Sequence, residues 1–172
     1  MDIYCDGGAR GNQNKENIGA WAYVVYNSNG DEIYHLADAV ENTTNNRMEL
    51  GACIWAVSLE GEKYDKLIIY SDSKYVVNGI NAYSYNWKRN GYKKANGGTV
   101  KNVELWKKLI NLVSIHDVTF KHVKGHSGNI GNERADELLN VEMDKYVRRD
   151  VNYESDMEDK KEFYSCIAND YW

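Results

Sequence analysis

The sequence lacks the features of several protein classes. None of its apolar runs is long enough for a membrane span, and no apolar stretch after Met1 resembles a signal peptide. We therefore expect a cytoplasmic protein with no membrane partner. The three cysteines, Cys5, Cys53 and Cys166, are far apart and form no CxxC pair, so the sequence suggests neither a zinc site nor a disulfide framework.

Length and composition predict one globular domain. The 172 residues are 42% hydrophobic and 27% charged, a profile typical of chains that bury a substantial core without disulfides. The chain is not long enough for two ordinary domains. We place the domain at residues 1–146, because residues 147–172 are acidic, aromatic and different in character.

The net charge conceals a strongly basic segment. The chain has 21 Lys and Arg against 26 Asp and Glu, a net charge of −5, which alone argues against a protein that coats nucleic acid. Residues 86–108, however, contain a single acid, Glu104, and seven bases: Lys88, Arg89, Lys93, Lys94, Lys101, Lys107 and Lys108. Because salt screens charges beyond about 8–10 Å, such a local patch can bind phosphates whatever the global sign.

The first third of the sequence predicts an antiparallel meander. Over Asp2–Asp6 we expect a strand that ends at Asp6 and leads into a turn at Gly7-Gly8. Residues 19–26 (GAWAYVVY) are rich in β-forming residues, and Asn29-Gly30 is a strong hairpin signal. Residues 32–40 then supply the return strand.

The rest of the chain predicts helices and parallel strands. Apolar residues recur at helical spacing from Met48 to Leu59, with Thr44, Asn45 and Asn46 as candidate N-caps. The further elements that we expect are a strand over 67–70, a short helix over 73–82, a helix over 100–114, a strand over 118–123 and a helix over 132–146. This order predicts an α/β fold in which a five-stranded mixed sheet, an antiparallel meander followed by parallel strands, has helices on both faces.

Four carboxylates fall at expected strand ends or on helix faces: Asp6, Glu49, Asp72 and Asp136. Each has a plain structural alternative. Asp6 could begin a turn, Glu49 could belong to a capping box begun by Asn46, Asp72 could cap the next helix, and Asp136 could be a surface acid. Together they indicate a site, because ligands bind at the carboxyl ends of strands in open α/β sheets and buried acids need a partner. All-oxygen ligands suit Mg²⁺ or Mn²⁺.

The acids and the basic segment point to one chemistry. Carboxylates repel a phosphodiester, so a site with both acids and a nucleic-acid surface makes sense only if metal ions lie between them. Two ions about 3.5–4 Å apart can activate a water and stabilise the leaving oxygen of an in-line displacement.

Several motifs carry a family resemblance: Asp6-Gly7-Gly8, residues 43–50 (TTNNRMEL), 71–76 (SDSKYV), Asn86-Trp87-Lys88, 124–128 (KGHSG) and 132–136 (NERAD). Over about residues 1–145 the chain resembles ribonuclease H of type 1, the bacterial ribonuclease HI family. The resemblance implies the ribonuclease H-like fold and an endonuclease that hydrolyses the RNA strand of RNA–DNA hybrids. Two Mg²⁺ ions would serve the reaction, with Mn²⁺ as a substitute, and the products would carry 5′-phosphate and 3′-hydroxyl ends.

The same resemblance implies catalytic roles. The carboxylates Asp6, Glu49, Asp72 and Asp136 would be the metal ligands. His126, on a glycine-flanked loop, would handle a proton or help product departure. Read without its flanking motif, His126 is simply a loop histidine.

The resemblance also implies contacts with the hybrid. Asn12, Thr44 and Asn46 resemble residues that contact nucleic-acid backbones, although Thr44 and Asn46 have a rival role as helix caps. Lys74 stands where bacterial relatives often have a substrate-contacting glutamine. A basic protrusion, hereafter the handle, resembles the hybrid-binding segment of the bacterial enzymes and comprises Trp87, Lys88, Arg89, Tyr92, Lys93 and Lys94. The alternative for the handle is a solvated loop.

Residues 147–172 lie outside the resemblance. Met157, Tyr164, Ile167 and Tyr171 could line one face of a short helix that docks on the domain, in which case the protein is a monomer. The alternatives for this extension are a dimer contact or a partner-binding tail. The rival functions are a non-catalytic hybrid-binding module on the same fold and a transposase- or resolvase-type nuclease.

Overall fold

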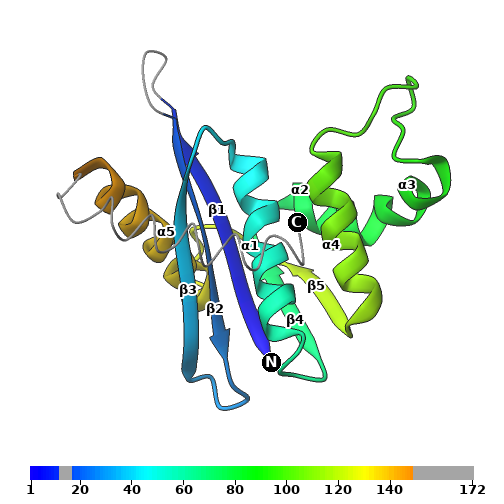
Figure 1. Cartoon of the computed structure of the whole chain (residues 1–172). Helices are drawn as coiled ribbons and strands as arrows, with labels where there is room; N and C mark the ends of the chain where they lie inside the picture. The colour runs from blue at the N-terminus through cyan, green and yellow to red at the C-terminus, as the bar shows by residue number, and fades with distance from the viewer. Residues whose placement is uncertain (12–16, 149–172) are drawn as a thin grey trace.

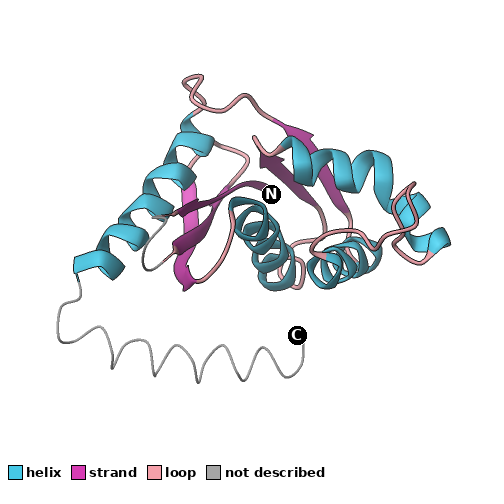
Figure 2. Ribbon diagram, turned by 90° about the horizontal axis from the view of Figure 1, so that it is seen from above, coloured by secondary structure: helices cyan, strands magenta, loops and turns pink. Residues whose placement is uncertain are grey.

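The computed structural model describes residues 1–11 and 17–148. A five-stranded sheet lies between α5 on one face and α1, α2 and α4 on the other (Figure 1, Figure 2). The strands are β1 (Asp2–Arg10), β2 (Ile18–Tyr26), β3 (Glu32–Glu41), β4 (Leu67–Ser71) and β5 (Val118–His122). The helices are α1 (Asn45–Glu60), α2 (Lys74–Asn78), the π-helix η1 (Gly79–Tyr83), α3 (Ser84–Asn90), α4 (Val103–Ile115) and α5 (Ile130–Arg148).

The sheet has the predicted mixed topology. Its strand order is β3-β2-β1-β4-β5. The pairs β1–β2 and β2–β3 are antiparallel, and the pairs β1–β4 and β4–β5 are parallel. Gly30 has a φ of 82° in the β2–β3 hairpin, the conformation for which the Asn-Gly signal selects. The predicted fold class is therefore confirmed.

Strand β2 shows why both faces of the sheet are covered. Its side chains alternate, and Ala20 and Ala22 pack in a small cluster with Leu139 and Met143 of α5. The intervening Trp21, like its neighbours Tyr23 and Val25, packs in the larger core with α1. Small residues on one face and large ones on the other let α5 lie close to the strand while α1 covers a thicker layer.

Strand β1 departs from the prediction because it does not end at Asp6. Gly7 and Gly8 are not a turn but continue the ladder, paired with Trp21 and Ala20 of β2. The reason for Gly7 is tertiary, since a Cβ on it would lie 2.2 Å from the backbone carbon of Met48. Glycine is required at this point because α1 crosses in direct contact with the strand.

The helical regions also differ in extent from the expectation. The short helix predicted over 73–82 instead continues through η1 into α3, which contains Trp87, Lys88 and Arg89 of the handle. Helix α5 begins two residues earlier than predicted and ends at Arg148, so the proposed division after residue 146 falls inside it. The docked helix expected in the extension lies outside the described residues. None of the helices in the described ranges is long and apolar enough to cross a membrane.

The contact at Gly7 predicts that Gly7→Ala destabilises the protein by about 3 kcal/mol, because the added Cβ would overlap the α1 backbone and force the helix and the strand apart. Gly8→Ala is the matched control, since its Cβ would lie 3.6 Å from Leu139 Cδ1, an ordinary contact. Urea unfolding of both variants measures the difference. Equal stability of the two variants would show that α1 does not depend on this contact.

Candidate active site

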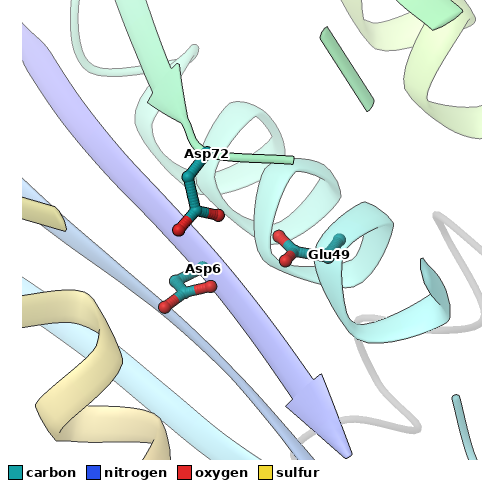
Figure 3. A group of neighbouring side chains, drawn as sticks. All are labelled: Asp6, Glu49 and Asp72. Carbon is teal, nitrogen blue, oxygen red and sulfur yellow. The ribbon is translucent and has the colours of Figure 1, made fainter. Parts of the chain in front are cut away.

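Three of the four predicted carboxylates meet in space. Asp6 lies within β1, Asp72 directly follows β4, and Glu49 comes from α1 (Figure 3). One ligand oxygen from each lies within 4.8 Å of the other two. In Figure 3, the side chains of Asp72 and Glu49 point toward the strand that carries Asp6. The three acids are called the carboxylate cluster below.

The parallel register of β1 and β4 explains why the two aspartates meet. Asp2 pairs with Ile68 and Tyr4 with Tyr70, and the same offset of 66 residues places Asp6 opposite Asp72. The paired ladder ends at Tyr4 and Tyr70, two residues before the acids.

Two structural alternatives for the acids are excluded by the observed helix caps. Thr44 caps α1 by accepting a hydrogen bond from the Arg47 N–H at 3.3 Å, so Glu49 is the fifth helical residue and not part of a capping box. Ser73, not Asp72, caps α2. Asp6 does not begin a turn either, because β1 continues past it (Figure 3).

Burial and mutual repulsion raise the pKa values of the cluster. Burial, and then the charge of Asp72, raises the pKa of Asp6 from 3.8 to about 8, although the Gly7 N–H donates to its Oδ1 at 2.8 Å and opposes the shift. Burial and the charges of Asp6 and Asp72 raise the pKa of Glu49 well above its ordinary value.

The cluster fits a divalent cation. In the described part of the chain, no lysine or arginine forms an ion pair with these three acids. The Glu49 Oε2 atom is buried and has no hydrogen-bond partner there. A buried acid without a basic partner is unfavourable, and hard oxygen ligands are the set that Mg²⁺ and Mn²⁺ prefer.

Asp136, the fourth predicted ligand, lies beside the cluster rather than within it. Its side chain is half-buried on α5, and its Oδ1 accepts a hydrogen bond from Asn140 Nδ2 at 3.2 Å. The charge of Asp136 contributes to the raised pKa of Asp6, so the two acids are electrostatic neighbours. It is not among the residues whose oxygens lie within 4.8 Å of one another.

Asn132 is a contact of the cluster that the sequence reasoning missed. Its side chain is 2% exposed, and its Nδ2 donates to Asp72 Oδ2 at 3.2 Å. Its Oδ1 is buried and has no partner among the described residues. The available signal was the spacing, because Asn132 precedes Asp136 by four residues and therefore shares its helix face.

His126 lies on a loop that touches the cluster. A Cβ on the preceding Gly125 would lie 2.5 Å from Asp72 Oδ2, so the loop backbone passes directly over that acid. His126 itself is exposed and has a φ of 51°, in the left-handed region. The predicted catalytic histidine therefore directly follows the glycine that contacts Asp72, and its side chain is open to solvent.

The predicted backbone contacts are placed as follows. Thr44 has the capping role, whereas Asn46 is an exposed residue within α1 and does not cap it. Lys74 is exposed at the start of α2, two residues after Asp72. Asn12 lies outside the described residues.

The handle has a packed inner side and a charged outer side. Trp87 is half-buried and packs against Trp106 of the core, with the ring centroids 5.0 Å apart and the rings tilted by 59°, and Tyr92 is also packed against the core. The four basic residues are all exposed: Lys88, Arg89, Lys93 and Lys94. The aromatic residues thus anchor the handle, and the charges face solvent. In Figure 1, α3 lies on the side of the molecule opposite α5.

Comparison with known proteins places this site in a family. A family model described as RNase H matches residues 1–143. Over 138 residues the chain is 49% identical to a ribonuclease H from Francisella tularensis subsp. novicida (strain U112), covering 80% of this chain and 86% of that protein. The chain belongs to the ribonuclease H family. It is a ribonuclease H enzyme, as the sequence motifs predicted.

Solved structures agree with the ribonuclease H fold. LC9-RNase H1, described as a type 1 RNase H with the type 2 active-site motif, matches with a TM-score of 0.65 and 28% identity, over 81% of this chain and 70% of that chain. LC11-RNase H1, solved in complex with an RNA/DNA hybrid, matches with a TM-score of 0.64 and 24% identity, over 85% and 98% of the respective chains. At 24% identity, the match to LC11-RNase H1 supports the fold alone.

The raised pKa of Asp6 predicts that the stability of this ribonuclease H depends on pH when a chelator keeps the protein free of metal. The folded state retains a proton that the unfolded chain releases, so this contribution to stability is complete below about pH 4 and is lost as the pH rises through about 8. We expect a higher urea midpoint at pH 5 than at pH 8, and a smaller difference in Asp6→Asn. The same pH dependence in both proteins would contradict the assignment.

Proposed function

We propose that the chain is an endonuclease that hydrolyses the RNA strand of RNA–DNA hybrids and leaves 5′-phosphate and 3′-hydroxyl ends. The observation that carries the proposal is the convergence of Asp6, Glu49 and Asp72 from three separate segments, in a member of the ribonuclease H family. A relative of the same fold has been solved with an RNA/DNA hybrid.

Two Mg²⁺ ions, which Mn²⁺ can replace, are proposed as cofactors. Bound at the cluster, they would supply Lewis acids that activate water and stabilise the oxygen leaving the cleaved phosphodiester. Asp6, Glu49 and Asp72 would bind the ions, with Asp136 as the fourth ligand. The charges that repel one another in the cluster are attractive toward a cation, which supports this role.

His126 is proposed to handle a proton of the reaction. Its loop lies over Asp72 through Gly125, and its exposed ring has room to approach a scissile phosphate from solvent. An imidazole can give or take a proton at the departing oxygen.

The hybrid is proposed to contact both the cluster and the handle. Thr44 and Asn46 are exposed near Glu49 at the start of α1, and Lys74 is exposed close to Asp72. The four exposed bases of the handle offer phosphate contacts. Trp87 and Tyr92 would support these bases from behind, and Asn12 retains the backbone contact that the resemblance implies.

We also propose that the enzyme is a monomer and acts in the cytoplasm. Its bacterial relatives support this location, because hybrids form where genomes are copied and transcribed. Residues 147–172 are proposed to dock on the domain formed by residues 1–146.

We predict that Asp6→Asn or Asp72→Asn lowers Mg²⁺-dependent cleavage of a labelled hybrid by at least about 10²–10³-fold, because each removes a charge that holds the metal. Asp117→Asn is the matched control, an exposed aspartate just before β5, at the end of the parallel strands away from the cluster. Duplex DNA and duplex RNA serve as substrate controls. Unchanged cleavage by either site variant would refute the ligand assignment, and tight hybrid binding without cleavage by the unaltered protein would favour the non-catalytic module.

We predict that Lys93→Gln/Lys94→Gln raises the KM for the hybrid and leaves kcat nearly unchanged, because these side chains bind phosphates away from the reacting bond. Each lost phosphate contact lowers the salt slope of binding by about 0.7–0.9. Lys66→Gln/Lys145→Gln makes the same change of net charge at exposed positions outside the handle. Equal KM values and salt slopes in the two double variants would remove the handle from the binding surface.

A further inference from the structure

Asn140 of α5 lies between Asp136 and β1. Its Nδ2 donates to the Asp136 backbone oxygen at 2.8 Å and to the carboxylate Oδ1 of the same residue at 3.2 Å. Its Oδ1 accepts from Arg10 Nη2 at 2.6 Å. Both ends of the amide are therefore engaged, and the side chain bridges the end of β1 to the fourth acid.

The arginine settles which way the amide points. A guanidinium donates hydrogen bonds and accepts none, so the oxygen of Asn140 must face Arg10 and the NH₂ group must face Asp136. Arg10 is itself held by Asp144, one turn further along α5, at 2.5 Å. The chain Asp144–Arg10–Asn140–Asp136 thus fixes a donor against one oxygen of Asp136.

The Asn140 amide donates to Asp136, the acid proposed as the fourth metal ligand. Asp136 is close enough to contribute to the raised pKa of Asp6, yet its oxygens lie outside the carboxylate cluster. A carboxylate with one oxygen restrained has fewer orientations available, and partners that restrain metal ligands in this way typically change metal affinity by about 10–100-fold.

We propose that Asn140, oriented by Arg10, is a positioning residue that fixes Asp136 beside the carboxylate cluster. The inference rests on the proposed function, in which Asp136 is the fourth metal ligand. Asn140 touches no reacting atom and acts only through Asp136. The competing interpretation is a purely structural role, in which Asn140 satisfies a helix carbonyl and affects stability alone.

The test measures metal binding by the full chain without nucleic acid, which separates the site from hybrid binding. Mn²⁺ and Mg²⁺ are titrated calorimetrically into the unaltered protein, Asn140→Leu and Asn111→Leu. The last is the matched control, an exposed asparagine on α4. We expect Asn140→Leu to weaken binding about tenfold and to raise by a similar factor the Mg²⁺ concentration that gives half-maximal cleavage. Unchanged or tighter metal binding would overturn the proposal, even if the urea midpoint falls.

Asp136→Asn separates a failure of this inference from a failure of the proposed function. If Asp136→Asn leaves metal binding unchanged, Asp136 is not a ligand and the proposed ligand set is wrong. If it weakens binding while Asn140→Leu does not, the ligand set stands and only the positioning role is refuted.

Arg10→Gln tests whether the arginine acts through the amide. We expect it to shift metal binding in the same direction as Asn140→Leu, and the double variant to be no weaker than Asn140→Leu alone, because both changes interrupt one chain of hydrogen bonds. Additive effects would show that Arg10 acts independently of Asn140.

Discussion

At Gly7 the backbone of β1 meets the backbone of α1 with no side chain between them. This contact brings the second turn of the helix onto the strand, so that Glu49 reaches the neighbourhood of Asp6. Asn45 reinforces it from the start of α1 by accepting a hydrogen bond from the Ala9 N–H at 2.6 Å. A larger residue at position 7 would lift the helix away and separate Glu49 from Asp6.

The convergence of these acids opposes folding in the absence of a cation. Desolvation and repulsion raise the pKa of Asp6 to about 8 and raise the pKa of Glu49 as well, so that the protonated acids are favoured. The rest of the molecule must hold the cluster together, through the register of β1 with β4 and through the buried amide of Asn132 against Asp72. A cation that displaces the protons would make the same charges stabilising.

Local patterns in the sequence predicted the elements, the sheet type and the identity of the carboxylate cluster, because strand alternation, helix periodicity and the hairpin signal are read from neighbouring residues. The failures have non-local causes. Gly7 looks like a turn residue, and only its contact with α1, about forty residues away, shows why β1 continues. The periodicity predicted the short helix only as far as residue 82, yet helical backbone continues through α3, where Trp87 packs against Trp106. The restraint on Asp136 depends on Arg10, 130 residues before Asn140.

Helices α2, η1 and α3 run without interruption from Lys74 to Asn90, so the handle is joined to the segment after Asp72 by continuous helical backbone. Gly79 leaves room for the Trp106 ring, so that this helical segment packs directly on α4. In an α-helix, one inserted residue turns everything beyond it by about 100° and advances it by about 1.5 Å. The direction in which Lys88 and Arg89 point therefore depends on the number of helical residues that precede them. Changes of length are compatible with this geometry in the loop after Gly91, whereas between Lys74 and Trp87 they would rotate Lys88 and Arg89 about the helix axis.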